Sequence, residues 1–153
     1  MKTVPPDVTL AMEDHIEAER NPRVLISGVY WLTVLDPRHK GATDYHFTAW
    51  CRRPELKSLL DLETSDVTML ETLIKVVFES LKLNKHDTRV LIHFPPDWWR
   101  LHVHFVPRCH RLPEGISLDE VFDVFEVIEN LKKDTDYYRK RVRVRPPILL
   151  ASI

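Results

Sequence analysis

Cysteine is scarce in this sequence: only Cys51 and Cys109 occur among its 153 residues, too few for a disulfide framework. We therefore expect free thiols in a reducing compartment. No stretch approaches the roughly 18 consecutive apolar residues that a membrane-spanning helix needs, and the first residues lack the apolar run of a signal peptide. These absences predict a cytoplasmic or nuclear location and no membrane partner.

An excess of charge of either sign is also lacking. The formal net charge is −1, although 29% of the residues are charged. A protein that coats nucleic acid would be markedly basic, so the composition argues against that class. Local positive charge would still suffice for a small nucleotide. The length suits one domain with a substantial core and is too short for two, so we expect residues 1–153 to form a single domain.

One short window, from His93 to Val106, holds three histidines, and the last two of them alternate with apolar residues. Because side chains alternate across a strand, His102 and His104 should share one face while their neighbours share the other. The first face should also carry Trp98, Arg100 and Val106, and the second Trp99, Leu101, Val103 and Phe105. We expect the first face to form a site and the second to join the core.

Two imidazoles on one face leave three interpretations open. One ring can attack phosphorus while the other holds its tautomer or carries a proton for the leaving group. A metal site would need a third ligand, and Asp97 is the one acidic residue within the window. The third interpretation is a partly buried, hydrogen-bonded pair without chemistry.

The remaining pattern predicts an α+β fold. Apolar residues in 67–83 recur at spacings of three and four residues, which predicts a helix with one apolar stripe packed on a sheet. Other helices are expected at 8–20 and at 118–132, the latter capped by Ser117. Strands are expected at 24–26, 29–35, 45–52, 88–94 and 141–145, besides the histidine strand. This succession predicts an antiparallel sheet with helices packed on one face.

The stretch His93-Phe94-Pro95-Pro96-Asp97-Trp98-Trp99-Arg100-Leu101-His102-Val103-His104-Phe105 resembles the signature of the histidine-triad (HIT) superfamily. It is most similar to the catalytic domain of the scavenger mRNA decapping enzymes. Residues 51–62, the run Val127-Ile128-Glu129-Asn130-Leu131 and residues 136–141 support this narrower match. The resemblance implies a HIT-like antiparallel fold, a homodimer, a small nucleotide substrate, and turnover without a metal or other cofactor.

The resemblance also implies an activity and the residues that carry it. The activity is hydrolysis of a 7-methylguanosine cap dinucleotide, or a short capped fragment, through a nucleotidyl-histidine intermediate. His102 matches the nucleophile, His104 the last histidine of the triad, and His93 an upstream active-site histidine. The residues expected to bind substrate are Asp36, Lys40, Asp97, Trp98, Arg100 and Arg111.

Two departures from the family pattern stand out. Arg100 occupies the position of the first triad histidine, so we expect the nucleophile to need another hydrogen-bond partner. Residues 1–35 are expected to form a short extension in place of the family's large N-terminal lid domain. These departures keep two alternatives open: a HIT hydrolase of another dinucleotide or of a nucleoside phosphoramidate, and a non-catalytic nucleotide-binding module.

Overall fold

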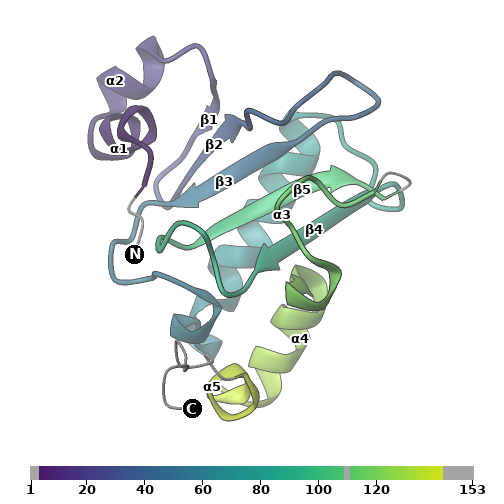
Figure 1. The fold of residues 1–153 in the computed structure, drawn as a ribbon. Coiled ribbons are helices and arrows are strands. Elements are labelled where there is room, and N and C mark those ends of the chain that lie inside the picture. The colour runs from purple at the N-terminus through teal and green to yellow at the C-terminus, as the bar shows by residue number, and fades with distance from the viewer. Residues whose placement is uncertain (1–3, 109–110, 143–153) are drawn as a thin grey trace, which may run out of the picture.

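The computed structural model describes residues 4–108 and 111–142, and their strands form one six-stranded sheet (Figure 1). The order across the sheet is β1-β2-β3-β5-β4-β6, and each neighbouring pair is antiparallel. The strands are β1 (Val24–Ser27), β2 (Trp31–Leu35), β3 (Phe47–Cys51), β4 (Thr88–His93), β5 (His102–Pro107) and β6 (Val121–Asp123). The expected α+β class is confirmed.

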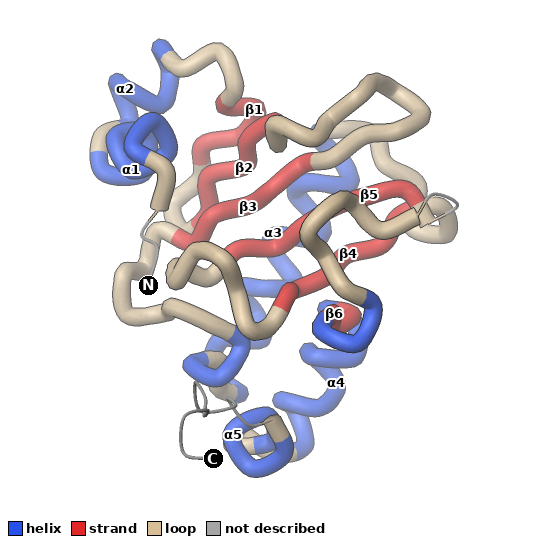
Figure 2. Tube along the Cα trace, in the orientation of Figure 1, coloured by secondary structure: helices blue, strands red, loops and turns tan. Residues whose placement is uncertain are grey.

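Helices lie on both faces of this sheet (Figure 2). The α-helices are α1 (Pro6–Glu13), α2 (His15–Arg20), α3 (Val67–Ser80), α4 (Val124–Lys133) and α5 (Tyr137–Arg141). The main core lies under α3 and α4, where their apolar stripes meet Ala49, Val103 and Phe105. On the opposite face, Val8 of α1 packs in a smaller cluster with Trp50. The packing of α3 and α4 on one face matches the expectation, whereas α1 lies on the opposite face.

β5 lies inside the sheet, between β3 and β4, and carries the histidines. His104 pairs with Thr48 of β3, and His102 pairs with Trp50. Val103 and Phe105 are fully buried in the main core, so the predicted alternation is confirmed. Because both flanking strands are hydrogen-bonded to β5, the two histidines are held on a rigid support.

Two helix predictions were wrong in their boundaries. The helix expected at 8–20 is broken at Asp14, whose backbone is extended and whose carboxylate accepts from the Ile16 N–H at 2.8 Å. This cap starts a second helix. The helix expected from 118 begins only at residue 124, where Asp123 and not Ser117 supplies the cap. Residues 121–123 form β6 instead, because pairing with β4 satisfies their backbone groups.

The two ends of the sequence pattern differ in outcome. The strands expected at 24–26 and 29–35 are present as β1 and β2, which join the sheet. Arg141 ends α5 rather than starting a strand, and residues 143–145 lie outside the described part of the chain. Cys51 is a buried free thiol, whereas Cys109 lies outside the described residues.

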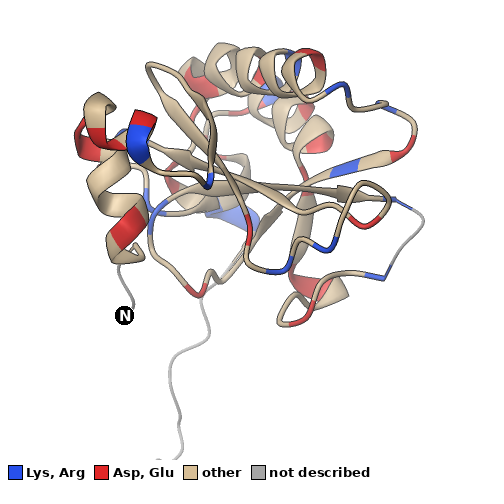
Figure 3. Ribbon diagram, turned by 90° about the horizontal axis from the view of Figure 1, so that it is seen from above, with Lys and Arg blue, Asp and Glu red and all other residues tan. Residues whose placement is uncertain are grey.

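The surface of the described part carries both signs of charge. In the view of Figure 3, acidic and basic residues are interspersed over helices and loops, and the middle of the sheet is mostly uncharged. None of the helices formed by residues 4–108 and 111–142 is long and apolar enough to cross a membrane. The mixed surface agrees with a net charge near zero.

Candidate active site

A cavity of about 340 Å³ opens over the histidine face of the sheet. Its floor comes from β5 and β3, and its walls come from α1, the loop after β2 and the loop between β4 and β5. The residues that line it are Pro5, Val8, Arg23, Val34, Asp36, Pro37, Arg38, Thr48, Trp50, His93, Asp97, Trp98, His102, His104 and Ile116. Five of the predicted site residues besides His102 are therefore brought to one place: Asp36, His93, Asp97, Trp98 and His104.

His102 is held by the backbone of its own strand. Its Nδ1 lies 2.7 Å from the carbonyl oxygen of Arg100, and a carbonyl can only accept, so Nδ1 carries the proton. The indole of Trp50 stacks on the ring, with centroids 4.3 Å apart. The expected need for another partner is thus met by the main chain of Arg100, which any residue at that position would supply.

The protonation of His102 suits a nucleophile. Burial lowers the pKa of its imidazole to about 4, against the opposing effect of the hydrogen bond to Arg100. At neutral pH the ring is therefore uncharged. Because Nδ1 holds the proton, the lone pair lies on Nε2, which is the nitrogen available to attack an electrophile.

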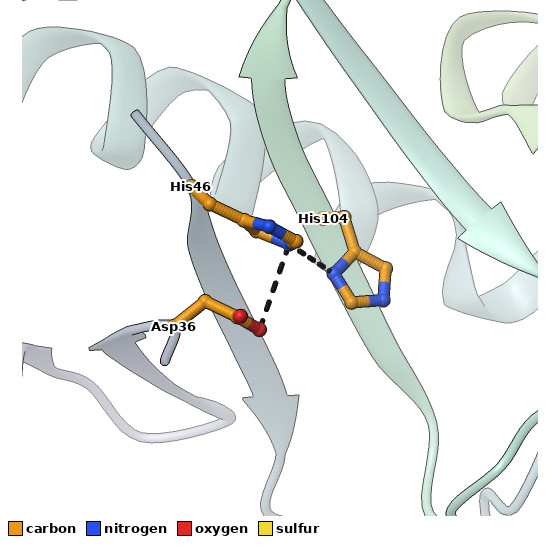
Figure 4. Close-up of side chains that lie close together, drawn as sticks. All are labelled: Asp36, His46 and His104. Carbon is orange, nitrogen blue, oxygen red and sulfur yellow. Dashed lines mark hydrogen bonds and ion pairs between the residues drawn. The ribbon is translucent and has the colours of Figure 1, made fainter. Parts of the chain in front are cut away.

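His104 belongs to a buried group with His46 and Asp36 (Figure 4). His46 Nε2 lies 2.8 Å from His104 Nδ1 and 3.5 Å from an oxygen of Asp36. That oxygen also accepts from the Thr48 hydroxyl at 2.8 Å. Arg38 donates to both oxygens of the carboxylate, at 2.9 Å and 3.1 Å. The group links the loop after β2, the start of β3 and the middle of β5.

The charges within this group follow from burial and from Arg38. Burial lowers the pKa of His46 to about 4 and lowers that of His104 well below its usual value. Burial acts to raise the pKa of Asp36, but hydrogen bonding from Arg38 and the nearby charges outweigh it and leave the pKa well below its usual range. At neutral pH the group therefore holds two uncharged imidazoles and one carboxylate paired with Arg38.

His46 and Arg38 were missed by the sequence argument. His46 lies far from the histidine window, and its contact with His104 joins residues 58 positions apart. A signal was nevertheless present, because His46, Thr48 and Trp50 alternate with apolar residues in the predicted strand 45–52. Arg38 lies in the same predicted loop as Asp36, but the sequence argument assigned Lys40 of that loop, and not Arg38, to substrate binding.

The loop between β4 and β5 supplies the other predicted residues. Asp97 and Trp98 line the cavity, whereas Trp99 packs against the main core, as the alternation predicted. His93 ends β4, and its Nε2 donates to Glu120 at 3.0 Å. Glu120 thus fixes the orientation of His93 from the segment before β6.

Lys40, Arg111 and Arg100 are not among the residues that line this cavity. Lys40 and Arg111 line a second cavity of about 340 Å³, and Arg38 borders both. The Arg100 guanidinium donates to the carbonyl oxygens of Cys51 and Arg52, at 2.8 Å and 3.0 Å. Arg100 precedes the first residue of β5, so the alternation of the strand does not fix its direction.

The antiparallel sheet, the paired histidines on its inner strand and the main-chain support of His102 define a histidine-triad-like domain. A family model described as "Scavenger mRNA decapping enzyme C-term binding" matches residues 11–114, and the chain belongs to this family. The match contains all three catalytic candidates, His93, His102 and His104.

The m7GpppX diphosphatases of two animals agree with this membership. The chain is 29% identical over 122 residues to the m7GpppX diphosphatase of Sus scrofa, covering 77% of this chain and 34% of the relative. It is 33% identical over 97 residues to that of Ascaris suum, covering 60% and 32%. The chain thus spans about a third of the length of these relatives. The aprataxin ortholog Hnt3 from Schizosaccharomyces pombe gives a TM-score of 0.47 at 17% identity, over 66% of this chain and 57% of that one.

Proposed function

We propose that this chain hydrolyses a 7-methylguanosine cap dinucleotide, or a short capped fragment, through a nucleotidyl-His102 intermediate. The observation that carries the proposal is the hydrogen bond from His102 Nδ1 to the Arg100 carbonyl, because it leaves Nε2 unprotonated beside a nucleotide-sized cavity. Membership of the scavenger decapping family supports the substrate class.

The chemistry takes two steps. His102 Nε2 attacks the phosphorus next to the methylated nucleoside, and a phosphorus–nitrogen bond forms as the bond to the leaving nucleotide's oxygen breaks. The leaving oxygen belongs to a phosphate group and takes its proton from water, because the buried ring of His104 is uncharged at neutral pH. Water then attacks phosphorus, breaks the phosphorus–nitrogen bond and releases 7-methyl-GMP with free His102.

The lining of the two cavities supports a substrate with two nucleosides. Both cavities have about the same volume, and the Arg38 guanidinium lies at the border between them. A cation there can stabilise negative charge on bridging phosphates. In the first cavity, Trp98 and Asp97 offer an aromatic face and a carboxylate, which suit a purine made cationic by methylation.

Release of 7-methyl-GMP from a methylated cap dinucleotide, with EDTA present, tests the function. We expect turnover without added metal, and faster turnover than with the unmethylated dinucleotide or with adenosine phosphoramidate. Equal rates with the unmethylated dinucleotide would contradict cap selectivity and favour the broader HIT hydrolase. Absence of turnover with every substrate, despite nucleotide binding, would favour the non-catalytic module.

We also propose that the chain forms a homodimer through the α3 side of the sheet. An apolar cavity of about 620 Å³ lies there between α3 and the β1–β2 hairpin. Beside it Val29 and Tyr30 are 77% and 52% exposed, which is unusual for apolar groups gathered at one place.

Sedimentation equilibrium tests the dimer. We expect the mass of two chains for the unaltered protein and of one chain for Val29→Asp, because burying a carboxylate in an apolar interface is costly. Leu118→Asp, at another exposed position, is the control and should leave the mass unchanged. A monomeric unaltered protein, or equal dissociation by both variants, would contradict this interface.

A further inference from the structure

Three potential ligand atoms converge beneath the cavity. Asp36, His46 and His104 each offer one ligand atom, these atoms all lie within 4.8 Å of one another, and all three side chains are buried (Figure 4). They come from three separate segments of the fold, and the sheet holds two of those segments directly. The convergence is therefore a property of the folded domain and not of a local sequence motif.

Two imidazole nitrogens and one carboxylate oxygen make a ligand set that suits zinc and similar divalent ions. Three protein ligands leave a position open for water or for an oxygen of a bound phosphate. The carboxylate is already oriented by Thr48 and Arg38, which is the kind of outer support that metal ligands commonly have.

We propose that Asp36, His46 and His104 form a binding site for Zn²⁺. The two nitrogens are 2.8 Å apart, and His46 Nε2 is 3.5 Å from Asp36 Oδ2. Zinc bound at about 2.0–2.1 Å places tetrahedral ligand atoms about 3.3 Å apart, so the rings need to separate by only about half an ångström. The Arg38 guanidinium forms an ion pair with the same Asp36 carboxylate, and its positive charge lowers the affinity of the site for zinc.

The bound ion would inhibit turnover. Zinc on His104 Nδ1 replaces the hydrogen bond between His104 and His46, and it places a positive ion beside the nucleophile's strand. A phosphate oxygen that enters the open position would be held away from in-line attack. This inhibition rests on the proposed function, whereas the binding of zinc does not.

Calorimetric titration with Zn²⁺, and with Co²⁺ as a coloured substitute, tests the site in the absence of substrate. We expect about one ion per chain, and a loss of affinity of at least about tenfold in Asp36→Asn, His46→Gln and His104→Gln alike. His39→Gln is the matched control, because His39 is close by but its ring packs on Phe47 and its Nδ1 accepts from the backbone N–H of His46 rather than from a ligand side chain. Circular dichroism would verify that each variant is folded.

Three results would overturn the site. They are no saturable binding by the unaltered protein, unchanged affinity in the folded variants, and an equal loss in His39→Gln. Loss of binding in His93→Gln alone would likewise overturn it, since that would move the ion to the His93–Glu120 pair. In the hydrolysis assay, zinc should slow the reaction and EDTA should restore it. If the protein binds zinc but hydrolyses none of the substrates, the proposed function is overturned, whereas the proposed zinc site is supported.

Discussion

Replacing His102 with alanine is expected to abolish hydrolysis of the cap dinucleotide, with turnover falling on the order of 10⁴-fold or more. The reason is that Nε2 of this ring forms the covalent bond to phosphorus in the proposed mechanism, and none of the other described side chains occupies the same position. The measurement is release of 7-methyl-GMP under single-turnover conditions, with EDTA present. His86→Ala is the control, because His86 is an exposed histidine outside both cavities.

The covalent intermediate gives a second readout of the same prediction. An alkaline quench during turnover should trap the labelled nucleotide on His102 of the unaltered protein and none on the His102→Ala chain. Added imidazole should partly restore activity to His102→Gly, because a small imidazole can occupy the vacated space. Substantial turnover by His102→Ala, or a label on His104, would contradict the assignment of the nucleophile.

Lowering the pH from 7.5 to 4.5 is expected to reduce the free energy of unfolding strongly. Burial lowers the pKa of His46 and of His102 to about 4 in the folded chain, from 6.5. Between these values the unfolded chain binds more protons, so stability falls as the pH falls. Each of these two rings should cost on the order of 2 kcal/mol at pH 4.5, so the buried histidines together cost several kcal/mol, roughly comparable with the whole stability of many small domains.

Urea unfolding at a series of pH values measures this effect. His46→Gln removes one of the three buried rings whose pKa is lowered, those of His46, His102 and His104, so its stability should vary less steeply with pH in this window. His86→Gln, at an exposed position, leaves all the buried rings in place and should keep the full dependence. A flat profile for the unaltered protein, or equal slopes for it and His46→Gln, would contradict the burial of neutral rings as the cause.

Local patterns account for the parts of the fold that the sequence predicted well. Period-two alternation placed His102 and His104 opposite Val103, and spacing of three and four placed α3 on the sheet. The boundaries near residues 118–124 were wrong because a residue type that caps helices stands at both Ser117 and Asp123. Only the pairing of β6 with β4, which is a tertiary interaction, decides between them.

In the candidate site, too, local patterns predict some residues, whereas others depend on tertiary contacts. Asp36, Asp97 and Trp98 reach the cavity because short loops carry them directly to strand ends. The contact of His46 with His104 depends on the register of β3 against β5, which no local pattern specifies. The direction of Arg100 could not be predicted either, because its two acceptors are carbonyl oxygens at the end of another strand.

The bond between His102 and the Arg100 carbonyl has an evolutionary consequence. Since the backbone supplies the acceptor, the side chain at position 100 is free to change while the reactive ring keeps its tautomer. In this chain the residue is an arginine, whose guanidinium donates to carbonyl oxygens at the end of β3. Searches that demand a histidine at each position of the signature would overlook such chains, whereas searches that weigh backbone geometry would retain them.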